Sequence, residues 1–276
     1  ATARRCFRKA PLLVLFAACI LVVVVIGFVR TFLSPWLQSS GVASAARTAQ
    51  FGQDTWVEQN LFYGLTGLTF VEFGARDGVL DSNTRWFEKN RAFRGLCVEP
   101  LQLEFGRLQW NRRDCDNVHG AISSKEGERE FLVVDGRLGW NGFIDTMPEP
   151  RLAELMRMTA RGEVTVRTLQ MQTFTLAHLV ERSVNFKRQH VDYLSIDTEG
   201  SELEIIKSFD LKALTISVIQ AEINDQTDHL KAYLLEQGYT VLGMNVGSDI
   251  IFGRKDFTPS SVGHPLSPGS DVPALV

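Results

Sequence analysis

Two short stretches of the sequence constrain the fold more than any other part of the chain. The first is Phe70–Gly78, FVEFGARDG, a run of β-forming residues followed by a turn that begins and ends with glycine. The second is Val191–Glu202, VDYLSIDTEGSE, where an apolar run again ends in a polar turn. A strand, a glycine turn and a helix open the nucleotide-binding unit of α/β folds, because small residues let the backbone approach a ligand. We therefore expect both turns to meet at the carboxyl edge of one sheet and to form the binding site there.

Strand-like and helical segments alternate through most of the chain, which predicts a doubly wound, mostly parallel sheet in an α/β domain. The expected strands are 69–73, 95–100, 117–122, 130–134, 163–170, 193–196, 213–223, 239–244 and 250–253. Residues 135–161 contain Gly, Pro and Trp without regular periodicity. We expect them to form an insertion over the edge of the sheet that could serve as a lid.

The N-terminal part of the chain has the composition of a membrane anchor. No charged residue occurs from Ala10 to Val29, and four cations precede this run within the first nine residues. A cleaved signal peptide is the alternative, but its apolar core is usually shorter. We expect Pro11–Leu33 to cross a lipid bilayer once, with the N-terminus on the cytosolic or matrix side. The mitochondrial inner membrane and the Golgi or endoplasmic reticulum both remain open.

Composition divides the chain and excludes some functions. We expect a basic segment and anchor at 1–33, a linker at 34–52, the α/β domain at 53–256 and an irregular tail at 257–276. A net charge of −3 argues against a nucleic-acid partner held through phosphate contacts. The four cysteines and five histidines form no pair with metal-ligand spacing, so no metal site is assigned to them.

Glu99 ends the second expected strand, about 20 residues beyond the glycine turn, where dinucleotide and nucleoside sites place an acid on the ribose hydroxyls. A structural glutamate at a strand end is the alternative. The turn reads GARDG rather than GxGxxG and lacks the full pyrophosphate cradle. This favours S-adenosylmethionine, which has no phosphate, over NAD.

The second turn carries Asp197 and Glu199, which could bind a ligand, orient a substrate or take a proton. Together with Glu222 they could also form an oxygen-rich metal site. The alternative is that they cap the following helix, where Ser201 and Glu204 have the spacing of a capping box.

With these residues the chain resembles the FkbM family of S-adenosylmethionine-dependent methyltransferases. The resemblance covers about Thr69–Arg254 and rests on FVEFGARDG, SNT, GLCVEP, VDYLSIDTEGSELEIIKSFD, VIQAEIN and EQGY, in this order. It implies a class I methyltransferase (Rossmann-like) fold, S-adenosylmethionine as the cofactor, and methyl transfer, often to a hydroxyl oxygen. The α/β domain would then be an FkbM-like methyltransferase domain preceded by a single transmembrane helix.

The resemblance also implies roles for single residues. Around the methionine part of the cofactor it places Glu72, Gly74, Asp77 and Gly78. It assigns the ribose to Glu99, the border of the adenine to Ala121 and Ile122, and the reaction centre to Asp197 and Glu199.

Some positions depart from the common family pattern. Glu72, Arg76 and Ser195 stand where many members carry Asp, Asn and Lys. These variants look like a eukaryotic branch that includes membrane-anchored, Star-like proteins. Arg76 could pair with Asp77 or Glu99 and obstruct the cofactor.

These observations support three hypotheses. The first is a membrane-anchored O-methyltransferase that acts on a small molecule, glycan or lipid, with Asp197 as base or orienting group. The second is a catalytically silent accessory subunit of a membrane complex, which Arg76 or residues 135–161 filling the pocket would favour. The third is a receptor-like trafficking protein of the secretory pathway. The sequence does not identify the methyl acceptor.

Overall fold

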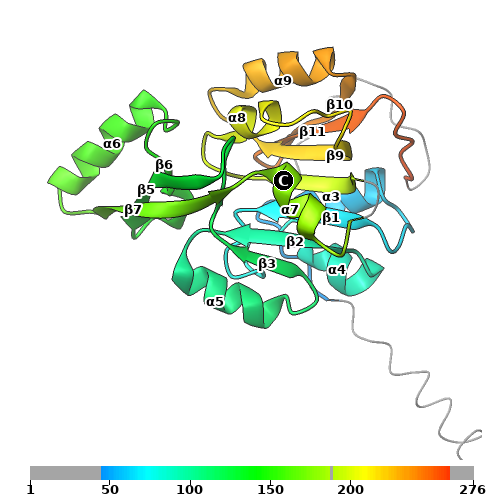
Figure 1. Ribbon diagram of the computed structural model, residues 1–276, viewed down its shortest axis with the longest axis horizontal. Helices are drawn as coiled ribbons and strands as arrows, with labels where there is room; N and C mark the ends of the chain where they lie inside the picture. The colour runs from blue at the N-terminus through cyan, green and yellow to red at the C-terminus, as the bar shows by residue number, and fades with distance from the viewer. Residues whose placement is uncertain (1–44, 187–188, 262–276) are drawn as a thin grey trace, which may run out of the picture. The chain divides into compact units, whose positions relative to one another are not determined.

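A seven-stranded mixed sheet forms the centre of the part of the chain that the computed structural model describes, residues 45–186 and 189–261 (Figure 1). In spatial order its strands are β10 (Tyr239–Val246), β11 (Asp249–Arg254), β9 (Thr215–Glu222), β8 (His190–Ile196), β1 (Thr69–Phe73), β2 (Arg94–Glu99) and β3 (Asp116–His119). The five strands from β9 to β3 are parallel to one another. Strand β11 pairs antiparallel with β9 on one side and with β10 on the other. The expectation of a mostly parallel α/β sheet is confirmed.

The apolar pattern of the strands explains why helices cover both faces of this sheet. Side chains alternate along β1, so that Val71 and Phe73 enter one core while Phe70 enters the other. The first core also contains buried residues of three helices: α7 (Leu176–Arg182), α8 (Glu202–Lys207) and α9 (Thr227–Glu236). The second core is built with α3 (Gln53–Asn60), α4 (Arg85–Arg91) and α5 (Gln102–Asn111). Strands that are apolar on both faces require such double cover.

The connection between β3 and β8 creates a switch point in the strand order. The chain passes from β1 to β2 and β3 on one side, and then returns to place β8 and β9 on the other. The two signature turns, 74–78 after β1 and 197–200 after β8, therefore follow adjacent strands, since Phe73 pairs with Ile196. Gly74 comes next, with a left-handed φ of 73°, and a Cβ at this position would collide with the Asp197 carbonyl oxygen. Open α/β sheets bind ligands beyond the carboxyl ends of the strands at this kind of point.

A second, four-stranded sheet was not foreseen from the sequence. Its order is β4 (Ala121–Ile122), β7 (Thr165–Phe174), β5 (Gly127–Asp135) and β6 (Gly142–Phe143). The expected single strand 117–122 is thus divided, and the segments expected at 130–134 and 163–170 pair with each other rather than with the main sheet. Gly120 makes the division, because its φ of 148° redirects the chain and a Cβ there would lie 2.7 Å from the Gln172 carbonyl oxygen.

The insertion at 135–161 belongs to this second sheet. It consists of η2 (Leu138–Trp140), β6 and α6 (Glu149–Ala160). Leu155 and Met158 of α6 pack with Leu132 and Val134 of β5 in a small core of their own. The insertion is therefore an ordered wall with its own packing.

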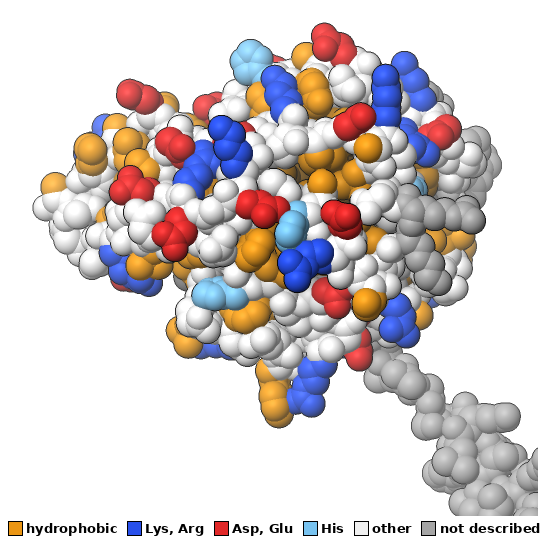
Figure 2. Space-filling model, in the orientation of Figure 1, with side chains coloured by type: hydrophobic (Ala, Val, Ile, Leu, Met, Phe, Trp, Pro, Cys, Tyr) orange, Lys and Arg blue, Asp and Glu red, His pale blue; other side chains and the backbone are white. Residues whose placement is uncertain are grey.

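The described parts of the expected linker and tail lie against the domain. The Arg47 guanidinium carbon stacks 3.6 Å from the ring centre of Trp86 on α4. Ser260 forms a β-bridge with Phe62. On the face that Figure 2 shows, acidic and basic side chains are interspersed, without a continuous basic stripe.

The predicted membrane anchor, Pro11–Leu33, lies outside the described residues. Among the residues that are described, no helix has the length and apolar character needed to cross a bilayer.

Candidate active site

A cavity of about 650 Å³ opens at the switch point, between the carboxyl ends of the main-sheet strands and the wall made by the second sheet. Its volume lies in the range of sites for small molecules and cofactors. Six of the nine expected site residues line it: Gly74, Glu99, Ala121, Ile122, Asp197 and Glu199. The other three expected residues, Glu72, Asp77 and Gly78, are not part of its lining.

Glu99, at the end of β2, is buried and its carboxylate is already oriented. Its Oε2 accepts a hydrogen bond of 2.8 Å from the Arg76 backbone N–H, and its Oε1 accepts one of 2.8 Å from that of Leu101. A carboxylate has about four acceptor sites, so each oxygen keeps capacity for one more donor. Burial raises the pKa of Glu99 to about 7, against the lowering effect of these two amides. The group can accept hydrogen bonds from two neighbouring hydroxyls, as a ribose presents.

An apolar slot lies beside Glu99. Ala121 and Ile122 of β4 are buried at the cavity wall, and Phe131 and Phe143 of the second sheet complete it with Leu101. A slot of this composition next to an acid suits a flat base attached to a sugar. Ala121 and Ile122, which the resemblance assigns to the border of the adenine, line this slot.

Glu72 holds the loop after β1 instead of facing the cavity. Its carboxylate is buried and accepts hydrogen bonds from the Asn83 backbone N–H at 2.7 Å and from the Thr84 hydroxyl at 2.8 Å. It also pairs at 3.2 Å with Arg112, which is fully buried. These contacts show how an acid at this position organises the turn after β1.

Asp77 and Gly78 shape the same turn. Asp77 Oδ1 accepts hydrogen bonds from the backbone N–H groups of Val79, at 2.8 Å, and Leu80, at 2.7 Å. Gly78 has a φ of 78° and packs so closely on α5 that a Cβ would lie 2.7 Å from the Leu108 side chain. Both residues support the loop from outside the cavity.

Arg76 does not make the side-chain contacts that the sequence suggested. Its guanidinium pairs with Asp81, whereas Asp77 receives no contact from it and Glu99 binds only its backbone N–H. Arg76 and Asp81 both line the cavity, which remains open beside them. The suggested pairing of the Arg76 side chain with Asp77 or Glu99 is therefore wrong.

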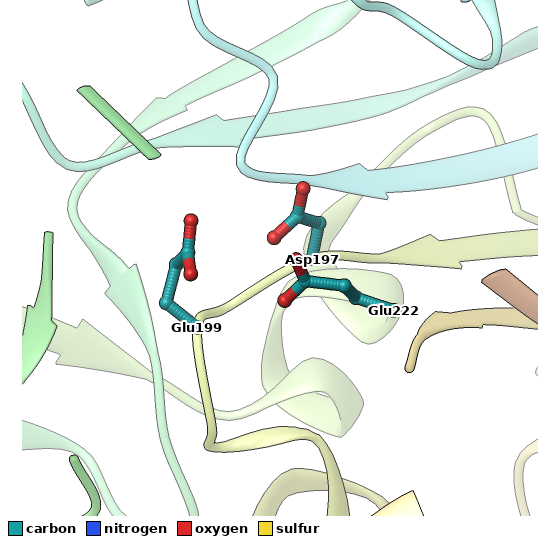
Figure 3. Close-up of side chains that lie close together, drawn as sticks. All are labelled: Asp197, Glu199 and Glu222. Atoms are coloured by element: carbon teal, nitrogen blue, oxygen red, sulfur yellow. The ribbon is translucent and has the colours of Figure 1, made fainter. Parts of the chain in front are cut away.

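Three carboxylates meet at the other end of the cavity (Figure 3). Ile196 pairs with Ala221, so the next residues of the two strands, Asp197 and Glu222, lie side by side. Glu199 approaches from the turn after β8, and one carboxylate oxygen of each of the three residues lies within 4.8 Å of the others. Oxygens at this spacing could ligate one hard divalent cation. Acidic groups of this kind are also common without an ion.

Crowding raises the pKa values of this cluster. Burial, followed by repulsion from neighbouring carboxylates, raises the pKa of Glu199 to about 8 and that of Glu222 to about 8. Enclosure by the protein around the cavity and repulsion from Glu222 raise the pKa of Asp197 well above its usual value. Because the Asp197 side chain is still exposed to water within the open cavity, desolvation is incomplete there, and repulsion is the firmer cause. The three groups therefore titrate as a coupled set.

Residues from the insertion complete the acidic end. Arg151 of α6 donates a hydrogen bond to Glu199 Oε2. Glu199 adopts a left-handed φ of 58°, and a Cβ on Gly139 would lie 3.3 Å from its Oε1. Trp140 and Arg137 line the cavity nearby. Sequence reasoning missed the arginines and the tryptophan, and their only signal was the cluster of Gly, Trp and Arg in an aperiodic segment.

The predicted capping roles in the second turn are wrong. Ser201 occupies the N-cap position of α8 without accepting a hydrogen bond from it, and its hydroxyl contacts that of Thr146 at 2.8 Å. Glu204 binds Ser124 and Arg129 instead of the cap. The turn is held by Glu202.

Glu202 Oε1 accepts hydrogen bonds from the backbone N–H groups of Thr198, at 2.9 Å, and Gly200, at 3.3 Å. Its Oε2 accepts one of 2.7 Å from the Asn224 amide. Asp197 and Glu199 are therefore not needed as caps, and both remain at the cavity.

The strand order, the switch point and the strand-end cavity define a methyltransferase-like α/β fold of class I. The model of the family described as "Methyltransferase FkbM domain" matches residues 72–241, which is more than half of the chain. The chain belongs to this family, as its motifs suggested. No curated protein sequence matches the chain.

Several solved structures are similar in fold. TrmK of M. capricolum, solved with S-adenosyl-homocysteine, is 9% identical; the match covers 76% of this chain and 71% of that one, with a TM-score of 0.42. The methyltransferase FkbM of Methylobacillus flagellatus KT is 13% identical, with coverages of 68% and 43% and a TM-score of 0.42. A methyltransferase of Pyrococcus furiosus is 12% identical, with coverages of 72% and 80% and a TM-score of 0.35. The expectation that the cofactor is S-adenosylmethionine agrees with membership of the methyltransferase FkbM family.

Proposed function

We propose that this protein is an S-adenosylmethionine-dependent O-methyltransferase whose cofactor and acceptor meet in the strand-end cavity. The observation that carries the proposal is the placement of Glu99 and Asp197. The first is an acid poised for two hydroxyl groups and the second is a candidate base, and both line one cavity. The family assignment supports the same reaction class.

At the cofactor end, Glu99 accepts hydrogen bonds from the ribose hydroxyls while Ala121 and Ile122 border the adenine. Gly74 keeps the backbone close to the methionine part. When bound, S-adenosylmethionine supplies an electrophilic methyl group on a sulfonium sulfur. The chain's own task is to orient the two reactants and to exclude competing water.

At the acceptor end, Asp197 accepts the proton of an acceptor hydroxyl as the oxygen becomes methylated. A raised pKa makes its carboxylate a stronger base than an ordinary aspartate, provided that it is ionised. Glu222 lies beside it and Glu199 pairs with Arg151, so Asp197 and Glu222 are the carboxyl groups of the cluster that face the acceptor.

The first experiment is a calorimetric titration of S-adenosylmethionine into the full chain in detergent, with Glu99→Ala and Glu128→Ala as matched variants. Glu128 is an exposed carboxylate on β5, away from the cavity. We expect wild type and Glu128→Ala to bind equally and Glu99→Ala to bind at least about tenfold more weakly, because a charged acceptor of hydrogen bonds is lost. Thermal unfolding checks that each variant is folded.

Absence of binding by the folded wild-type chain would contradict the enzyme proposal. Two hypotheses would then remain: a silent accessory subunit of a membrane complex, in mitochondria or elsewhere, and a receptor-like trafficking protein of the secretory pathway. Attachment to a bilayer through residues 11–33 is a separate proposal, based on their apolar composition. Localisation of tagged full-length protein, with and without that segment, tests it and separates the mitochondrial inner membrane from the Golgi and endoplasmic reticulum.

A further inference from the structure

Arg137 differs from the other cations of the cavity. Three arginines line the cavity, and the other two are paired with acids, as described above. Among the described residues, no acid lies within ion-pair distance of Arg137. Its guanidinium carbon lies 5.1 Å from the ring centre of Trp140, in a cation–π arrangement. A guanidinium held over an indole face keeps its N–H donors available at its edge.

Two acids that flank the Arg137 turn are engaged elsewhere. Asp135, two residues before it, pairs with Arg167 at 3.6 Å. Glu163, just before β7, pairs with Arg161 at 2.6 Å. These two acids therefore do not neutralise the positive charge of Arg137, which lies at the cavity on the turn next to its acidic end.

The turn that carries this pair is well braced. The Arg137 backbone N–H donates to the Val134 carbonyl oxygen at 3.2 Å, and the Trp140 N–H donates to the Arg137 carbonyl oxygen at 3.1 Å. Asn141 Oδ1 accepts a hydrogen bond of 2.8 Å from the Val134 N–H. The backbone thus presents both side chains on one short 3₁₀ turn that faces the cavity.

We propose that Arg137 and Trp140 form a subsite for an oxyanion, a phosphate or carboxylate carried by the methyl acceptor. This inference rests on the proposed function, because it assigns the acceptor to the same cavity. The planar guanidinium matches a phosphate or carboxylate through paired hydrogen bonds. The carboxyl groups of Asp197 and Glu222 can bind a hydroxyl and, when ionised, repel an oxyanion, so the acceptor points its hydroxyl toward them and its oxyanion toward Arg137. The acceptor class is an acidic or phosphorylated alcohol, such as a sugar acid, a sugar phosphate or a phospholipid headgroup.

Saturation-transfer NMR on the full chain saturated with S-adenosylhomocysteine tests this proposal. The probes are glucose, glucuronate and glucose 6-phosphate, which share a sugar ring, and dihexanoyl phosphatidic acid below its micellar concentration. The variants are Arg137→Gln and Arg113→Gln. Arg113 is the matched control, because its guanidinium carbon also stacks on an indole, 3.8 Å from the ring centre of Trp110, outside the cavity.

We expect the anionic probes to bind about tenfold more tightly than glucose, and this preference to vanish in Arg137→Gln but to persist in Arg113→Gln. A preference for phosphatidic acid over both charged sugars would identify a lipid acceptor, and the reverse a soluble or glycan acceptor. An unchanged preference in Arg137→Gln, or no preference in the wild type, would overturn the subsite.

A parallel titration with S-adenosylhomocysteine separates the two proposals. If Arg137→Gln weakens this cofactor product as much as it weakens the oxyanions, Arg137 belongs to the cofactor site and the acceptor subsite is wrong. If the wild type binds no S-adenosylhomocysteine but still selects oxyanions through Arg137, the methyltransferase proposal fails while the oxyanion site stands.

Discussion

Arg151, on α6, donates a hydrogen bond to Glu199 Oε2 in the turn after β8, and this ion pair joins the insertion to the acidic end of the cavity. A second link lies close by, where the Thr146 hydroxyl contacts that of Ser201 at 2.8 Å. The wall of the cavity is thus held by side chains from both sheets. Changes in the insertion should therefore affect the carboxylates as well as the acceptor.

We expect Arg151→Ala to lower the free energy of unfolding by about 1–3 kcal/mol, because the half-buried carboxylate of Glu199 loses its charged partner. Arg151 also lowers the pKa of Glu199, so its removal should raise that pKa further. The control is Arg157→Ala on the same helix, whose ion pair with Glu154 is exposed and should contribute less than about 1 kcal/mol. Urea unfolding of the three proteins measures the difference. Equal losses in both variants would contradict the bracing role of Arg151.

Gly74→Ala should damage both signature turns. A Cβ at Gly74 meets the Asp197 carbonyl oxygen in addition to the strain of a φ of 73°. The matched control is Gly64→Ala, where φ is 72° and no atom lies within 4 Å of the added Cβ. We expect Gly64→Ala to cost about 1–2 kcal/mol of stability from strain alone, and Gly74→Ala at least about 1–3 kcal/mol more. Thermal unfolding and cofactor titration measure both effects, and cofactor binding should be lost only in Gly74→Ala.

The acidic cluster should make the protein less stable as the pH rises. Glu199 and Glu222 have pKa values of about 8, raised first by burial, against a usual value of 4.5. Between these limits the folded state binds more protons than the unfolded state, so the free energy of unfolding falls from about pH 4.5 to about pH 8. Glu222→Gln removes one of these charges and should raise the melting temperature at pH 8 but not at pH 5. Glu128→Gln, on the surface, should leave the pH profile unchanged; the same shift in both variants would refute the assignment.

Glu72 should act through stability and not through contact with the cofactor. Its removal leaves Arg112 fully buried with one acidic partner fewer, which costs about 3–5 kcal/mol in comparable buried pairs. We expect Glu72→Ala to melt at a much lower temperature, while the fraction that is folded binds S-adenosylhomocysteine within about threefold of wild type. Titration at low temperature measures this binding. A large loss of affinity in a variant that melts like wild type would place Glu72 at the ligand.

Features that depend on residues close together in the sequence could be predicted, whereas features that depend on distant residues could not. Strands β1 and β8 and their turns were predictable because runs of β-formers and glycines act within a few residues. The N-cap contacts of α8 were not, since the Ser201 hydroxyl contacts that of Thr146 and Glu204 binds Ser124 and Arg129, which are distant in the sequence and compete with the cap. A capping box read from spacing alone cannot detect such a competitor.

The second sheet shows a different limit. The segments at 130–134 and 163–170 have strand patterns, but the spacing of apolar residues does not reveal which strand each segment pairs with. Gly120 decides it, because its backbone turns β4 away from β3 and toward β7. The insertion then lies beside the main-sheet edge and brings Arg137, Trp140 and Arg151 to the cavity.

The sequence by itself determined the class of fold, the family, and six of the residues that line the cavity, since these depend on local periodicity, turn chemistry and motif order. Only the tertiary structure decided that Arg151 pairs with Glu199, 48 positions away, and that Glu72 supports the loop after β1. Such relations depend on strand register and on packing between distant segments. They are non-local, because a side chain's role is set by the neighbours that folding brings to it.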